Sequence, residues 1–400
     1  MKEKIQKRFS VIQFLWWAAM IGGIYIVAYL KELGLSGTQI GVTSSIGALF
    51  GAILLPVMGK LSDRLGSAKT PLLITAGAGV FLCMFLPLVG RTVTKAPMIV
   101  MVFSVVLLII RAQQNSLADS FCIGVISDYG IPYTQIRMWG SLGYTSISLI
   151  VTALMAKAFP MEIVFYVSPL LFLPLGFLIA RADREKLAQA KPAATENREK
   201  VSLKAIFKNY YFVVYVVFVL GLNVQQGITF MYLPYLLGGA GIDGKYLALF
   251  TGFRSVFELL SMLICVRLCK SGRVKLWQIL LFSGAFFSLE HVLYPMAKGY
   301  LMMFLIMIPS GLASGIQYGV APNYIFKIVD ERVRYTCQTI NGVCISVVSI
   351  VGTLCGGLII DHYGIYALTN VNLCILIAAT LTFAVFNLLG PKLAKGCSNA

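Results

Sequence analysis

Ionisable side chains lie inside long apolar stretches of the sequence, and five of them are candidates for chemistry. An ionisable residue in membrane hydrocarbon costs about 2.5–3.5 kcal/mol on insertion scales, so such residues are candidates for binding or proton transfer. A guanidinium can hold a carboxylate or two hydroxyl groups through its fork of donors, and a buried carboxyl group can carry a proton. The five residues are Arg111, Asp119, Arg137, Arg254 and Glu258.

Helical spacing places several of these residues on shared faces. Arg111, Asn115 and Asp119 recur every four residues, so they share one face of a helix. Arg254 and Glu258 are also four residues apart. Two interpretations stay open for each set. The charges belong to a polar centre between two halves of the chain, or they neutralise each other as structural pairs.

The elements that must position these residues are membrane-spanning helices. Between residues 8 and 390 we find twelve mostly uncharged stretches, each long enough to cross a hydrocarbon core of about 30 Å. Hydrophobic residues make up 58% of the chain and charged residues only 12%, against about 25% charged residues in soluble domains. The stretches are approximately 9–30, 39–59, 71–90, 97–122, 137–156, 162–180, 206–232, 245–266, 276–297, 299–326, 337–359 and 364–388.

The distribution of positive charge predicts the orientation. With both termini in the cytoplasm, the inner connections and the stretch ends beside them hold 24 of the 33 Lys and Arg residues, and the outer ones hold 6. This asymmetry follows the positive-inside rule. We therefore expect a multi-pass protein of the cytoplasmic (inner) membrane with both termini inside. The net charge of +17 then faces anionic lipid, and we do not interpret it as nucleic-acid binding.

A charged linker divides the chain into two similar halves. Residues 181–204 are rich in Lys, Arg, Glu and Ala and too polar to bury. A shift of 206 residues superposes matching positions of the halves, such as Tyr29 on Tyr235. We expect residues 1–180 to form one six-helix bundle, 181–204 a cytoplasmic linker, and 205–400 a second bundle with a short cytoplasmic tail.

A motif of glycines and charges follows the second stretch, in the run Gly59-Lys-Leu-Ser-Asp63-Arg64-Leu-Gly66-Ser-Ala-Lys69. Gly59 would allow close helix packing, Gly66 would end a turn, and Asp63 can receive basic groups or a helix N-terminus. The run resembles the signature G-x-x-x-D-R-x-G-x-x-K/R of the major facilitator superfamily. The resemblance implies a conformational latch made of Gly59, Asp63, Arg64, Gly66 and Lys69.

A second run, Arg137-Met-Trp-Gly140-Ser-Leu-Gly143-Tyr144, resembles the fifth helix of the lactose permease family. An acid in the fourth helix and a Glu-Leu-Leu in the eighth belong to that pattern, and Asp119 and Glu258 match them. Residues 29–41 look equally like the phenylpropionate-permease and nucleoside-proton-symporter relatives. By this resemblance Arg137, Asp119 and Glu258 would contact substrate and Tyr144 would stack on it. Alternatively, Arg137 only anchors the cytoplasmic end of its helix.

The resemblance implies proton coupling, but the usual proton carriers are missing. The tenth stretch has Gln317 and no central charge. If protons drive transport, Glu258 or Asp119 must carry them, and Glu258 is taken as the only acid deep in a second-half stretch. We expect both histidines, His291 and His362, to be surface residues.

Other polar and aromatic residues could complete a binding site. Rings stack on a polyol while amides bond its hydroxyl groups, although a single ring is equally compatible with helix packing. The run that begins at Asn223, followed by Pro234, predicts a break in the seventh helix that lines a cavity. The further candidates are Trp17, Asn223, Gln226 and Gln317.

These observations predict an all-α membrane protein of twelve transmembrane helices in two pseudo-symmetric six-helix bundles. The resemblance implies a monomer that works by alternating access as a proton symporter of a sugar, an oligosaccharide or a nucleoside. Its partners would be that small-molecule substrate, protons and the lipid bilayer. We expect no enzyme activity, no cofactor, no metal and no nucleic acid. The alternatives are uptake or efflux of an amphipathic organic anion such as an aromatic acid, and a non-transporting membrane receptor.

Overall fold

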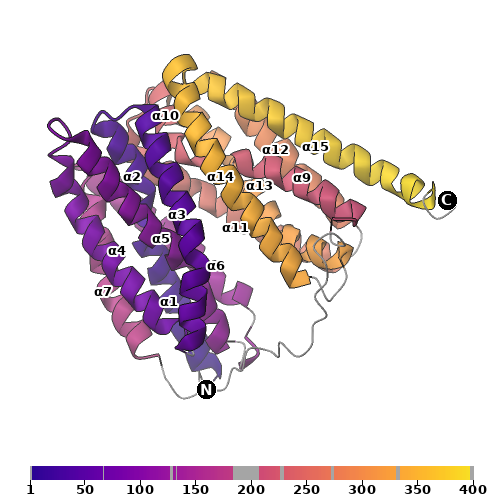
Figure 1. Cartoon of the computed structure of the whole chain (residues 1–400), viewed down its shortest axis with the longest axis horizontal. Coiled ribbons are helices and arrows are strands. Elements are labelled where there is room, and N and C mark those ends of the chain that lie inside the picture. The colour runs from indigo at the N-terminus through magenta and orange to yellow at the C-terminus, as the bar shows by residue number, and fades with distance from the viewer. Residues whose placement is uncertain are drawn as a thin grey trace. The chain divides into compact units, whose positions relative to one another are not determined.

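The computed structural model describes residues 2–65, 67–126, 129–131, 133–182, 207–225, 229–271, 274–329 and 334–396. The regular elements within these ranges are helical (Figure 1). They are α1 (Lys2–Ala19), α2 (Ile21–Glu32), α3 (Gly37–Arg64), α4 (Lys69–Gly90), α5 (Pro97–Ile126), α6 (Tyr133–Ala156), α7 (Ile163–Ala180), α9 (Tyr210–Val224), α10 (Leu233–Gly239), the 3-10 turn η3 (Gly244–Tyr246), α11 (Leu247–Ser271), α12 (Leu276–Leu293), the 3-10 turn η4 (Tyr294–Met296), α13 (Gly299–Ile328), α14 (Arg334–Tyr363) and α15 (Ile365–Gly396).

Eleven helical segments within the described ranges are long and apolar enough to cross a membrane. They match eleven of the twelve predicted stretches, which confirms the predicted all-α membrane fold. The remaining stretch, 206–232, corresponds to the shorter helix α9. Helix α9 ends at Val224 and α10 begins at Leu233. Of the residues between them, 226–228 lie outside the described part of the chain, so the predicted break in the seventh helix stays a prediction.

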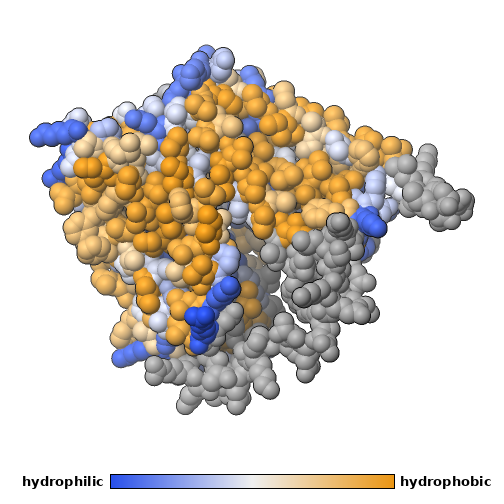
Figure 2. All heavy atoms as spheres, in the orientation of Figure 1, coloured by the Kyte–Doolittle hydropathy of each residue, from blue (hydrophilic) through white to orange (hydrophobic). Residues whose placement is uncertain are grey.

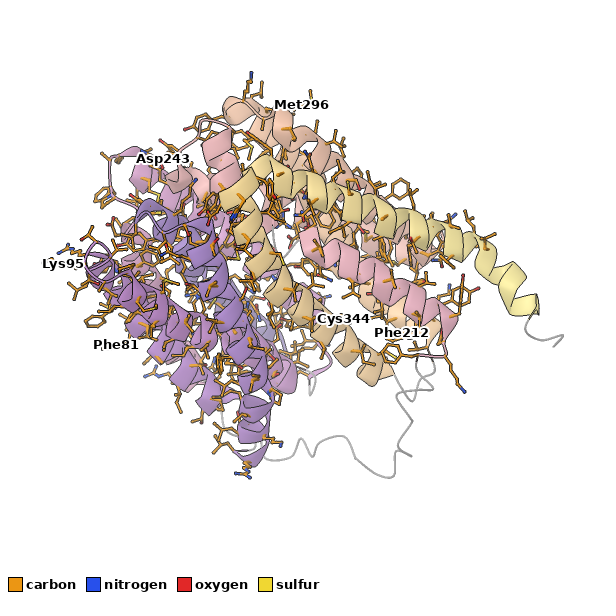
Figure 3. All side chains as sticks on the ribbon, turned by 45° about the horizontal axis from the view of Figure 1, so that its top comes forward. Phe81, Lys95, Phe212, Asp243, Met296 and Cys344 are labelled. Carbon is orange, nitrogen blue, oxygen red and sulfur yellow. The ribbon has the colours of Figure 1, made fainter. Side chains whose placement is uncertain are left out.

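Apolar side chains cover the flanks of the helices. In the view of Figure 2, hydrophobic residues cover most of the visible helix sides, and hydrophilic ones gather at helix ends. Phe81, on α4, is 62% exposed and points away from the neighbouring helices, whereas Lys95 lies in the connection after that helix (Figure 3). Exposed apolar flanks with charged ends suit a helix that is surrounded by lipid.

The chain divides into two compact units. Unit 1 comprises residues 1–194, 243–255 and 353–361, and unit 2 comprises residues 195–242, 256–352 and 362–400. The predicted bundle 1–180 lies wholly in unit 1. Unit 1 also contains the first turns of α11 and the last turns of α14. The predicted linker 181–204 lies outside the described residues from residue 183 onward, and the division into two six-helix bundles stays a prediction.

Unit 1 is built around α1, which packs against α6 and α7. Two glycines of α6 allow α1 to approach α6 closely. A Cβ atom at Gly143 would overlap the backbone oxygen of Phe14, and one at Gly140 would overlap the Trp17 ring. Because residues three apart lie on one helix face, the glycines of the Arg-x-x-Gly-x-x-Gly run form the surface on which α1 packs.

The core of unit 2 gathers aromatic rings from α9, α12, α13 and α15. Phe218 and Phe383 stack with their centroids 4.2 Å apart, and Phe287 and Tyr324 are buried in the same cluster. This packing fixes α12 against α13 and α15.

Candidate functional site

In unit 1, two predicted site residues meet where α1 packs on α6. The Cζ atom of Arg137 lies 3.9 Å from the centroid of the Trp17 ring, and both side chains are half-buried. Gly140 faces the same ring. Because Gly140 has no side chain, the indole can approach α6 closely enough for a cation–π interaction with Arg137.

Asp119, on α5, completes this cluster. The hydroxyl group of Tyr133 donates a hydrogen bond of 2.5 Å to its Oδ1 atom, and the charge of Arg137 acts on its carboxylate. Tyr133 and Arg137 are four residues apart, so they lie on one face of α6. Tyr133 is not among the residues predicted from the sequence, although its spacing from Arg137 could have identified it.

Hydrogen bonds orient the two tryptophans of α1. Trp17 Nε1 donates to Gln13 Oε1 at 3.1 Å, and Gln13 Nε2 donates to the thiol of Cys122 at 3.3 Å. Trp16 Nε1 donates to Asn115 Oδ1 at 3.3 Å. Asn115 therefore touches the site through Trp16, which is itself 1% exposed.

Arg111 bonds to the backbone at a helix break, and its role in substrate binding stays a prediction. Its Nη2 atom donates to the backbone oxygen of Met20 at 3.1 Å, at the break between α1 and α2, and Nη1 lies 3.5 Å from the sulfur of Cys83. A Cβ atom at Gly23 would overlap the guanidinium. Within the described residues, Arg111 therefore satisfies a carbonyl group at a helix break, and its contacts do not include the alternative partner Asp119.

The first turns of α11 pack on α6 inside unit 1. Tyr144 is 7% exposed, and its hydroxyl group donates to Thr251 Oγ1 at 2.6 Å. Arg254, one turn after Thr251, is 8% exposed. Tyr144 thus joins α6 to α11, and its stacking on a substrate stays a prediction.

Apart from Arg254, the second-half candidates lie in unit 2. Glu258 is half-buried, where α11 approaches α13 so closely that a Cβ atom at Gly315 would overlap its backbone oxygen. Gln317 is buried, and its Oε1 atom has no hydrogen-bond partner among the described residues. Asn223 is buried and donates to its own helix, at Val219 O. Gln226 lies outside the described residues.

Lys69 of the predicted latch binds the end of another helix. Its Nζ atom donates to the backbone oxygens of Ala180 at 2.6 Å and Ala182 at 3.0 Å, at the C-terminus of α7. A cation suits a helix C-terminus, where backbone carbonyls carry partial negative charge. Arg64, in the last turn of α3, is exposed.

Gly59 differs from its predicted role. A Cβ atom there would meet no described atom within 4 Å, so the predicted close helix packing at Gly59 is wrong for this structure. The reason is that Gly59 lies on an open face of α3. The side chain of Asp63 and the whole of Gly66 lie outside the described part of the chain.

A buried pair at the end of α12 corrects two sequence expectations. His291 was expected at the surface but is 0% exposed, and the adjacent Glu290 is 2% exposed. His362 is exposed, as predicted. Glu258 is therefore not the only acid deep in a second-half helix. The burial of the pair is possible because Gln225 and Thr229 bond to its polar atoms.

Comparison with known proteins decides the family. The model of the MFS_1 like family matches residues 7–370. The chain belongs to the major facilitator superfamily. Curated relatives of this transporter include the uncharacterized transporter YwbF of Bacillus subtilis, 20% identical over 91% of this chain and 90% of that protein. The maltose permease of Geobacillus stearothermophilus is 23% identical over 84% of this chain and 82% of that protein.

Solved structures show the same fold. A point mutant of the nucleoside transporter NupG superposes with a TM-score of 0.78, at 16% identity, over 96% of this chain and 99% of that chain. A POT family transporter superposes with a TM-score of 0.68 at 13% identity, over 97% of this chain and 95% of that chain. The protein is therefore a secondary transporter with the major facilitator fold, and not an enzyme.

Proposed function

We propose that this transporter is a proton-coupled symporter of a small hydroxyl-rich solute, namely a sugar, an oligosaccharide or a nucleoside, and that it works by alternating access. The observation that carries the proposal is the stack of Arg137 on Trp17 at 3.9 Å, with Asp119 held by Tyr133 beside it. An indole supplies a flat apolar surface for a sugar ring, and the charged groups bond its hydroxyls.

The charge of this cluster favours a neutral solute. A hydroxyl group both donates and accepts, so it can bond to the guanidinium of Arg137 and to the carboxylate of Asp119. A carboxylate substrate would be attracted by the arginine and repelled by the acid. Two relatives, a maltose permease and a nucleoside transporter, are named for solutes of this class.

We further propose the cytoplasmic (inner) membrane as the location, with both termini inside, from the asymmetry of Lys and Arg. The segment Gly59–Lys69 would then lie at the cytoplasmic end of α3 and act in conformational switching. The bond of Lys69 to the end of α7 supports this role. Glu258 and Asp119 are proposed to carry the coupled proton.

A thermal-stability screen of the purified protein tests the substrate class. A ligand present at 100 times its Kd stabilises the protein that it binds by about 2.7 kcal/mol. We expect at least one sugar or nucleoside to raise the Tm and aromatic acids to leave it unchanged. A rise with aromatic acids alone would refute the proposed substrate class and favour an organic-anion transporter.

A further inference from the structure

Glu290 lies in a buried hydrogen-bond network of unit 2. Its Oε2 atom accepts from Gln225 Nε2 at 3.0 Å, and its Oε1 atom accepts from the hydroxyl group of Tyr294 at 2.6 Å. The three side chains are 1–3% exposed. Met296, labelled in Figure 3, marks the turn η4 that follows this end of α12. A carboxyl group is thus removed from solvent on a helix whose core positions are otherwise largely apolar.

The neighbouring His291 has a defined tautomer when it is neutral. Its Nδ1 atom lies 2.9 Å from the backbone oxygen of Phe287, and its Nε2 atom lies 2.8 Å from Thr229 Oγ1. Because a carbonyl oxygen only accepts, the hydrogen is on Nδ1, and Nε2 accepts from the threonine hydroxyl. Thr229 in turn accepts from Asn372 Nδ2 at 3.2 Å.

Two amide oxygens of this network have no role in that arrangement. Gln225 Oε1 and Asn372 Oδ1 are buried and have no hydrogen-bond partner among the described residues. An unpaired buried acceptor is unfavourable, so these two atoms point to a second state of the network in which they are used.

An added proton supplies that second state. If Glu290 is protonated, its hydroxyl group can donate to Gln225 Oε1 once the amide turns over. If His291 is protonated, its Nε2 atom donates to Thr229. The threonine hydroxyl then donates to Asn372 Oδ1, once the side-chain amide of Asn372 has also turned over. In both cases a proton from solvent joins an existing lone pair, and no bond between heavy atoms changes.

The network holds two residues of the region between α9 and α10. Gln225 directly follows α9, and Thr229 precedes α10. Glu290 bonds to Gln225 and His291 bonds to Thr229. A change of protonation on α12 therefore acts on both residues at once.

Few other charges face this network. Helices α9 and α10 hold no charged residue. Helices α13 and α15 pack on α12 and carry charged residues only near their C-termini, namely Lys327, Lys392 and Lys395. Lys298, which precedes α13, is exposed. Tyr294 is the titratable group bonded to Glu290, and phenols stay neutral below about pH 10. Among the described residues, Glu290 and His291 are thus the groups of this network that can change their charge by binding a proton.

We propose that Glu290 and His291 form a proton-binding site whose occupancy controls the conformation of the seventh helix through Gln225 and Thr229. This site would act in addition to Glu258 and Asp119. It would serve the proton coupling put forward above, so this inference rests on the proposed function.

Hydrogen–deuterium exchange of the purified full-length protein, without substrate, tests the site. After correction for intrinsic rates, peptides from residues 210–239 should change their exchange in a step between about pH 4 and pH 8. The step should be lost or displaced in Glu290→Gln and His291→Gln, and retained in the matched control His362→Gln. A wild-type protein without a step, or the same step in all four proteins, would overturn the proposal.

Thr229→Val covers the case in which those variants do not fold. The substitution keeps the shape of the side chain but removes the link between His291 and Asn372. We expect the midpoint to move by about one pH unit or more, a tenfold change in proton affinity. An unchanged midpoint would overturn the proposal. The exchange experiment contains no substrate, so its result is independent of transport. If gradient-driven uptake fails in a separate measurement, that result counts against symport and not against this site.

Discussion

The guanidinium of Arg137 stacks on the ring of Trp17 at 3.9 Å, and Gly140 makes the stack possible. The spacing of the Arg-x-x-Gly-x-x-Gly run in α6 therefore has a physical explanation in this chain. Its glycines let α1 approach α6, and its arginine is placed on an α1 indole beside the acid of α5.

Arg137→Lys should weaken substrate binding about tenfold or more, which is about 1.4 kcal/mol. Lysine has neither the planar surface that stacks on Trp17 nor the fork that bonds two hydroxyls. The matched control is Arg181→Lys, whose guanidinium also covers a ring, Phe177, at 4.0 Å but lies at an exposed helix end. Titration calorimetry with the solute found in the screen measures both. If Arg137→Lys binds the solute as tightly as the wild-type protein does, Arg137 only anchors the cytoplasmic end of its helix.

Gly143→Ala should destabilise unit 1, because the added methyl group would overlap the backbone of Phe14. Overpacking of this kind costs about 1–3 kcal/mol. Gly176→Ala, on α7, is the control, since no described atom lies within 4 Å of its added Cβ. Thermal unfolding in detergent should show a lower Tm for the first variant only. A similar Tm for both would refute the close contact of α1 with α6.

Asp361 should hold the start of α3. Its carboxylate accepts from the backbone N–H groups of Gly37 at 2.7 Å and Thr38 at 2.6 Å. Loss of such a cap costs about 0.5–2 kcal/mol, so Asp361→Ala should speed hydrogen exchange at residues 37–45. Asp243→Ala, which removes the cap of the short turn η3, should leave that exchange unchanged. Unaltered exchange in the Asp361 variant would show that the cap contributes little.

Glu258→Gln should abolish uphill accumulation driven by a pH gradient and leave exchange of internal for external substrate partly active. Exchange needs no net release of protons, whereas accumulation does. Asp119→Asn should instead weaken substrate binding, because the cluster with Tyr133 and Arg137 loses its negative charge. Proteoliposomes measure both activities. If accumulation by Glu258→Gln is undiminished, the coupled proton is carried elsewhere, and loss of coupling in Asp119→Asn alone would place it in the first half.

Reporter fusions should find the segment 181–204 in the cytoplasm and positions near Gly90 and Lys298 outside. The physical reason is the concentration of Lys and Arg in the connections assigned to the inner side. The reverse pattern would overturn the orientation, and with it the cytoplasmic placement of the Gly59–Lys69 segment.

The sequence predicted the membrane helices well, because length and apolar composition depend on local residues alone. The resemblance to the lactose permease family brought Arg137 and Asp119 into one candidate site, and in the structure the charge of Arg137 acts on the carboxylate of Asp119. The break near Asn223 stays a prediction, because residues 226–228 lie outside the described part of the chain.

Other features depend on contacts that no local pattern contains. The burial of His291 requires Thr229 and Asn372, which come from distant parts of the chain. Arg111 bonds a backbone carbonyl at the break after α1, and helical spacing within α5 instead suggested Asp119 as its partner. Such partners are set by tertiary packing, so they became visible only in the folded chain.

Uptake into proteoliposomes with an imposed inside-alkaline pH gradient tests the central claim most directly. The probes are labelled maltose, a labelled nucleoside and a labelled aromatic acid, each with and without a protonophore. We predict that a sugar or nucleoside accumulates above its external concentration and that the protonophore abolishes this accumulation. Accumulation of the aromatic acid alone, or uptake of the neutral solutes that is indifferent to the gradient, would contradict the account.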